Sequence, residues 1–259
     1  MTENAPVFTG VGVALVTLFD EAGEVDYDAT AAHAARLAEL GMTAIVVAGT
    51  TGEVDALTDD ERLRLFDAVR AAVPPSSGVA VVAGTGATST RQARALTAAA
   101  LGSGADAFLA RSPRAVADPT GYYQAIAEAA GDIPVLAYHF PRVSPPGIPL
   151  ELLPSLPVVG CKDSSGSPER LLATLTTWSG ALYMGSATLL VQAGAVGAAG
   201  AILALANAEP ELCVAAFAGD ADAQLKLVPG HLAAAAAFPS GIKGLVAKRF
   251  GTSAAARIR

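Results

Sequence analysis

The feature that most constrains this chain is a repeated unit. A short apolar run rich in β-branched residues is followed by a polar or glycine loop and then by an alanine- and leucine-rich stretch with helical spacing. This alternation favours a parallel sheet, because each parallel crossover needs a helix, which also covers one face of the sheet. The runs are nearly continuous, as expected for strands buried on both faces. We predict strands at residues 11–16, 44–47, 79–83, 106–109, 135–138, 158–161, 182–184 and 201–203.

The stretches between these strands have the pattern of helices. Thr58 and Glu61 form a capping box at the start of one of them. About eight strand–helix units close an α/β (β/α)8 TIM barrel, with an open doubly wound sheet as the main competitor. No long linker divides the 259 residues, so we predict a barrel over residues 1–220 with a shortened C-terminal helical extension, 221–259, packed on it. The predicted helices are 27–40, 58–72, 88–101, 119–130, 168–175, 188–195 and 210–218.

Composition argues against several partners. A net charge of −7 would repel nucleic acid over most of the surface. The longest apolar runs, such as residues 193–208, are broken by glycines and by Asn207, so they fall short of the ~20 apolar residues that a membrane span needs. We therefore expect neither a nucleic-acid nor a membrane partner.

Residue order and motif spacing favour a cytoplasmic protein that needs no metal. Residues 1–9 are polar and lack the basic, apolar and small-residue order of a signal peptide. Cys161 and Cys213 lie in no CxxC or Cys/His cluster, and we interpret them as buried reduced thiols. The three histidines form no HxH or HExxH motif, so we expect no metal site.

Lysine is scarce in this chain, with four residues: Lys162, Lys226, Lys243 and Lys248. Lys162 directly follows the predicted strand at 158–161, and the chemistry of such barrels lies at the C-terminal ends of the strands. Burial there favours the uncharged amine, which is the nucleophile that forms a Schiff base with a ketone. A lysine that reaches solvent along its stem, or pairs with Asp163, is the alternative interpretation.

Tyr138 ends another predicted strand. A phenol at that position can carry a proton between a carbinolamine and a substrate hydroxyl, because it both donates and accepts. An amphipathic aromatic that caps the core is the alternative. We interpret His139, which alternates to the other side of the strand, as structural.

A third strand end carries Gly49, Thr50, Thr51 and Gly52. Exposed backbone N–H groups in such a loop form a nest that suits a carboxylate. The loop is not a phosphate-binding P-loop, since no lysine follows the second glycine, and residues 84–86 lack the third glycine of a dinucleotide fingerprint.

Together these pieces resemble the dihydrodipicolinate synthase / N-acetylneuraminate lyase family of class I pyruvate-dependent aldolases. The resemblance runs from Phe8 to Asn207, with weaker traces to Lys243, and marks a divergent short member. It implies a (β/α)8 barrel, a helical extension and a homo-oligomer, a dimer or tetramer. The motifs that carry it are residues 49–53 (GTTGE), 83–87 (AGTGA), 138–141 (YHFP), 160–166 (GCKDSSG) and 200–202 (GAI) leading to Asn207.

The resemblance also implies roles for single residues. Lys162 would form the Schiff base with pyruvate or another 2-keto acid, and Tyr138 would relay the proton that makes or breaks the aldol bond. Thr50 would join that relay. No metal or organic cofactor is needed, because the iminium itself is the electron sink. Thr51, with Thr50 and Gly49, would hold the carboxylate, Ile202 would pack beside the keto acid, and Gly185 would line the pocket.

Two departures from the synthases of this family bear on the aldehyde partner. Those synthases carry a tyrosine pair after the fourth strand, where this chain has Arg114 and Ala115, and an arginine where it has Val143. We therefore expect a lyase that acts on an acid such as a 2-keto-3-deoxy sugar acid. The alternatives are a 4-hydroxy-tetrahydrodipicolinate synthase, which condenses pyruvate with aspartate semialdehyde, and a non-catalytic 2-keto-acid-binding protein. Arg111 and Arg114 either contact an acidic substrate or lie solvated in a loop.

Overall fold

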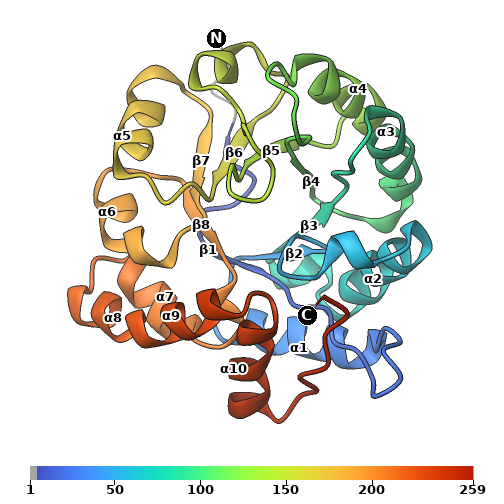
Figure 1. Cartoon of the computed structure of the whole chain (residues 1–259), viewed down its shortest axis with the longest axis vertical. Coiled ribbons are helices and arrows are strands. Elements are labelled where there is room, and N and C mark those ends of the chain that lie inside the picture. Colours follow the sequence, from blue (N-terminus) through green and yellow to red (C-terminus); the bar gives the residue numbers. More distant parts are fainter. Residues whose placement is uncertain (1–4, 259) are drawn as a thin grey trace.

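Eight parallel strands form a closed barrel in a computed structural model that describes residues 5–258 (Figure 1). Each strand pairs with the next along the chain, and the last pairs with the first. This order confirms the predicted (β/α)8 barrel and excludes the open doubly wound sheet. The strands are β1 (Gly10–Ala14), β2 (Ala44–Val47), β3 (Ala80–Gly84), β4 (Ala107–Arg111), β5 (Val135–His139), β6 (Gly160–Asp163), β7 (Ala181–Met184) and β8 (Gly200–Leu203).

Helices form the outer ring around the strands (Figure 1). The capping box is present at the start of α2, where Thr58 N donates to Glu61 Oε2 at 2.8 Å and Glu61 N donates to Thr58 Oγ1 at 3.2 Å. The helices that follow the strands are α1 (Tyr27–Glu39), α2 (Asp59–Ala72), α3 (Thr90–Ala99), α4 (Thr120–Ala130), α5 (Pro168–Thr177), α6 (Leu190–Ala195) and α7 (Pro210–Phe217).

Apolar side chains fill two layers, one inside the barrel and one between the strands and the helices. At the N-terminal end of the barrel interior the rings of Phe8 and Tyr183 stack, with their centroids 4.5 Å apart, and Tyr183 Oη donates to Phe8 O at 3.2 Å. Both rings are buried and belong to the apolar cluster that fills the barrel interior.

Three further helices follow the barrel: α8 (Ala221–Lys226), α9 (Val228–Ala236) and α10 (Ser240–Phe250). They form a group beside α7, and the last residues return toward α1 (Figure 1). The division of the chain at residue 220 stays a prediction.

Two observations concern the chain as a whole. No helix among residues 5–258 has the length and apolar character to cross a membrane. Cys161 and Cys213 are both free and buried, and burial raises the pKa of the Cys161 thiol to about 12. Neither thiol is therefore activated as a nucleophile.

Candidate active site

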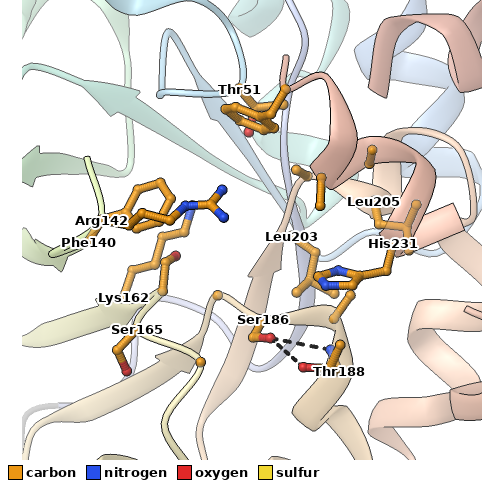
Figure 2. A pocket seen from close by; sticks show the side chains of 18 of the residues that line it. Thr51, Phe140, Arg142, Lys162, Ser165, Ser186, Thr188, Leu203, Leu205 and His231 are labelled. Atoms are coloured by element: carbon orange, nitrogen blue, oxygen red, sulfur yellow. Dashed lines mark hydrogen bonds between the residues drawn. The ribbon is translucent and has the colours of Figure 1, made fainter. Parts of the chain in front are cut away.

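Lys162 lies at the C-terminal end of β6 and points into a cavity of about 340 Å³, which we call the lysine cavity (Figure 2). Tyr138, Thr51 and Gly185 line the same cavity. Lys162 is only 5% exposed, and its Nζ lies 4.4 Å from the centroid of the Tyr138 ring. The two residues are also direct partners in the register of β5 and β6. The amine is therefore enclosed next to an aromatic face.

Asp163 does not pair with Lys162. Its carboxylate makes an ion pair with Arg170 on α5, at 3.2 Å, and accepts from Ser165 N at 2.7 Å. Successive residues of a strand point to opposite faces, so Lys162 faces the interior of the barrel and Asp163 faces the helices. The burial of Lys162 likewise excludes the interpretation in which the side chain reaches solvent.

The end of β5 is braced from the helix layer. Tyr123 Oη on α4 donates to Ala110 O at 3.0 Å and accepts from Tyr138 N at 3.4 Å. His139 Nδ1 accepts from Ile148 N at 2.8 Å, and burial, with the nearby Arg170, lowers the pKa of His139 to about 4. His139 is thus a neutral acceptor that holds the loop after β5, in agreement with its structural interpretation.

The Gly49–Gly52 loop is a tight turn between two residues with left-handed backbone, Ala48 at φ 52° and Glu53 at φ 58°. Such conformations are costly for residues other than glycine and cluster at functional sites. Thr17 Oγ1 donates to Gly52 O at 2.8 Å and ties the turn to the segment that follows β1. The turn places Thr51, which is 3% exposed, on the lysine cavity.

Thr50 and Gly49 lie on a second cavity of about 630 Å³, which we call the arginine cavity. Tyr138 and Arg142 line both cavities. The predicted residues are therefore brought to one end of the barrel but divided between two adjoining spaces. The arginines of the second cavity are Arg62, Arg111, Arg114 and Arg142.

The two remaining predicted residues differ in position. Gly185 lines the lysine cavity, where a Cβ would collide with Ser164 Oγ. Ile202 is fully buried among the side chains that fill the barrel interior, and its neighbour Leu203 lines the lysine cavity. The role of Ile202 beside a keto acid stays a prediction.

Sequence reasoning missed several residues of the lysine cavity. Arg142, from the loop after β5, and His231, on α9, face each other across it (Figure 2). Burial, followed by the charge of Arg142, lowers the pKa of His231. Ser164, Ser186 and Thr188 add hydroxyl groups, and among the described residues no Asp or Glu lines the cavity. Arg142 directly follows the motif at residues 138–141, which is a signal that could have found it. No local pattern marks His231 in its alanine-rich helix.

Among residues 5–258 no group of three or more His, Cys, Asp or Glu side chains is placed to hold a metal ion.

Comparison with known proteins identifies the family. The sequence profile of the Dihydrodipicolinate synthetase family matches residues 7–258. The chain belongs to this family. Its members are class I pyruvate-dependent lyases and synthases, and the chain is an enzyme of that class.

Two curated relatives in the dihydrodipicolinate synthetase family share the name 4-hydroxy-tetrahydrodipicolinate synthase. The 4-hydroxy-tetrahydrodipicolinate synthase of Pseudomonas aeruginosa is 37% identical over 250 residues, which cover 88% of this chain and 83% of that protein. The enzyme of the same name from Synechococcus elongatus is 38% identical over 205 residues, covering 75% of this chain and 68% of the relative.

Solved structures of the family share the fold. Dihydrodipicolinate synthase from Cyanidioschyzon merolae with lysine bound superposes with a TM-score of 0.85 at 28% identity, covering 93% of this chain and 90% of that one. The DapA-2 enzyme from Bacillus anthracis gives 0.83 at 30% identity, covering 96% and 92%. This chain thus has the barrel and the C-terminal helices of its family.

Proposed function

We propose that Lys162 forms a Schiff base with the keto carbon of pyruvate and that the protein makes or cleaves the aldol bond of a 2-keto acid. The observation that carries this proposal is a lysine, 5% exposed, in a cavity that it shares with Tyr138 and Thr51. No carboxylate among the described residues pairs with this amine, so it is free to attack a carbonyl carbon.

The proposed sequence conserves every atom. The Lys162 nitrogen adds to C2 of pyruvate, and the carbinolamine loses water to give an iminium. A proton leaves C3, the resulting enamine attacks the carbonyl carbon of an aldehyde, and the aldehyde oxygen takes up a proton. Water then hydrolyses the iminium and releases product and lysine, and cleavage is the same path in reverse. Tyr138 is the proposed carrier of these protons, and Thr50 its partner.

The hydroxyl groups of Ser164, Ser186 and Thr188 support a polyhydroxylated aldehyde as the second substrate, and hence a 2-keto-3-deoxy sugar acid as the aldol. A second candidate is 4-hydroxy-tetrahydrodipicolinate synthesis from aspartate semialdehyde. Its support is the guanidinium of Arg142 in the lysine cavity, which suits a carboxylate, and the name that the relatives carry.

Reductive trapping tests the Schiff base. The protein is incubated with pyruvate and borohydride, and the modified residue is found by mass spectrometry. We expect one adduct, at Lys162, which is lost in Lys162→Ala. Lys226→Ala, which removes an exposed lysine of α8, should label like the wild type. Labelling that persists in Lys162→Ala would reject the assignment.

A panel of aldehydes then separates the reactions. Turnover with glyceraldehyde-type polyhydroxy aldehydes supports the sugar-acid aldolase, and turnover with aspartate semialdehyde supports the synthase. An adduct at Lys162 without turnover of any aldol would identify a 2-keto-acid-binding protein instead.

Two further properties belong to this proposal. The free, buried cysteines fit a reducing compartment, and we place the protein in the cytoplasm. The family resemblance implies a homo-oligomer, a dimer or tetramer, which light scattering of the purified protein would measure.

A further inference from the structure

Arg111 occupies the strand position next to the two proposed catalytic groups. It is the last residue of β4, and its register partner on β5 is Tyr138, whose partner on β6 is Lys162. Residues in register on neighbouring strands present their side chains to the same face. Arg111 is therefore part of the same row inside the barrel mouth and not a solvated loop residue.

The guanidinium of Arg111 is fixed by two contacts with the segment after β2. Its Nη1 donates to Thr50 Oγ1 at 3.3 Å, and its Nη2 donates to Asp55 Oδ1 at 2.9 Å. The Arg111 side chain is 22% exposed and the Asp55 side chain 55%, so the ion pair is open to solvent on the carboxylate side. Asp55 thus anchors one end of the guanidinium while the other end reaches the Thr50 hydroxyl.

A glycine in the segment after β3 allows that segment to approach β4 closely. Gly86 follows β3, and a Cβ there would lie 2.7 Å from Arg111 N, closer than real structures allow. Arg62 Nη2 donates to Gly86 O at 2.9 Å and holds this segment in place. With no side chain at position 86, the segment after β3 can pack directly against the β4 backbone at Arg111.

We propose that Arg111 is a positioning residue that orients the Thr50 hydroxyl for proton transfer. A threonine hydroxyl has one hydrogen, and the Arg111 N–H occupies one of its lone pairs. The hydrogen of Thr50 is then free to point into the arginine cavity, which Tyr138 also lines. Thr50 thereby becomes a donor toward Tyr138. This inference rests on the proposed aldol chemistry, in which Tyr138 and Thr50 carry the proton.

The test compares Arg111→Met, Arg111→Lys, Thr50→Val and the double variant Arg111→Met/Thr50→Val. Arg111→Met should lower kcat of the aldol reaction about 10-fold or more, because positioning is a part of the 10²–10⁴-fold effect of general acid–base groups. KM for pyruvate and trapping at Lys162 should stay within about twofold, since only the proton step changes. Arg111→Lys, which keeps a donor, should restore part of kcat.

The double variant provides the decisive readout. If Arg111 acts through Thr50, the double variant is no slower than Thr50→Val alone. Losses that multiply, or a raised KM with unchanged kcat, would overturn the inference. Arg114→Met removes another charge from the same cavity and should cost less than about threefold; an equal loss there would assign the effect to charge alone. Failure of wild-type trapping at Lys162 would instead reject the proposed function.

Discussion

Tyr138 lines both the lysine cavity and the arginine cavity, as does Arg142. Its ring lies against Lys162 Nζ, and stacks on Phe140 with centroids 5.8 Å apart. The ring therefore has a packing role that is separate from the role of its hydroxyl. A phenylalanine at this position keeps the packing role of the ring and removes the hydroxyl.

We expect Tyr138→Phe to keep the fold and the pyruvate adduct at Lys162, but to lower kcat about 10²–10⁴-fold, the usual contribution of a general acid–base group. Steady-state kinetics and borohydride trapping on the same preparation measure both effects. A variant with unchanged kcat would show that another group carries the proton.

Single residues differ in how far the sequence predicts them. Lys162 and Tyr138 each end an apolar strand, and the strand ends of a parallel barrel converge, so their proximity follows from local patterns. His231 reaches the lysine cavity only because α9 packs over the barrel mouth. The hydrogen bond between Arg111 and Thr50 likewise joins residues 61 positions apart. Neither contact has a local signature.

The bounds of helices and strands could be predicted from the sequence where a local sequence pattern marks them. The capping box at Thr58 fixes the start of α2, and the residues predicted for the second strand are those of β2. At β1 the prediction was one residue late at its start and two late at its end, with residues 11–16 predicted where the strand is Gly10–Ala14. Leu15 and Val16 continue the apolar run past β1 and are buried. Leu15 N still donates to Val46 O of β2, whereas Val16 N donates to the Asn207 side chain, so composition alone could not mark the end of the strand.

The burial of His33 between α1 and α10 predicts that the stability of the protein depends on pH. His33 on α1 is 1% exposed beside the ring of Phe250, with centroids 5.5 Å apart, and burial, with the charge of Arg36, lowers the pKa of His33 to about 4. Well above pH 6.5 His33 is unprotonated in both the folded and the unfolded state. As the pH falls from 6.5 toward 4, only the unfolded state takes the proton, so the free energy of unfolding falls.

Between pH 7 and pH 5 this histidine should cost about 2 kcal/mol of stability. Urea unfolding at pH 7 and pH 5 measures this loss. In His33→Leu the free energy of unfolding should fall by about 2 kcal/mol less between these pH values than in the wild type. His139, with a pKa also lowered to about 4, remains in both proteins and contributes equally. Identical pH dependence in the two proteins would contradict the assignment to His33.

At the scale of the whole molecule, the end of the chain is joined to the turn that carries Thr50 and Thr51. Glu53, directly after that turn, and Lys243 on α10 are both fully buried and form an ion pair. Glu53 Oε2 also accepts from the backbone N–H groups of Arg257, at 2.8 Å, and Ile258, at 2.6 Å. This clamp holds the last residues of the chain and the candidate site together, although they are about 200 positions apart in the sequence.

Removal of one partner from this clamp leaves a buried charge without compensation. Lys243→Met should therefore lower the free energy of unfolding by about 3–5 kcal/mol. In Glu53→Gln/Lys243→Met both charges are gone, while the glutamine oxygen still accepts from the terminal backbone, so at least half of the loss should be recovered. Chemical denaturation of both variants measures this recovery. Because Glu53 fixes the turn beside Thr51, Lys243→Met should also raise KM for pyruvate, and the double variant should lower it again. A double variant that is as unstable as Lys243→Met, or less stable, would show that the pair acts through packing and not through its charges.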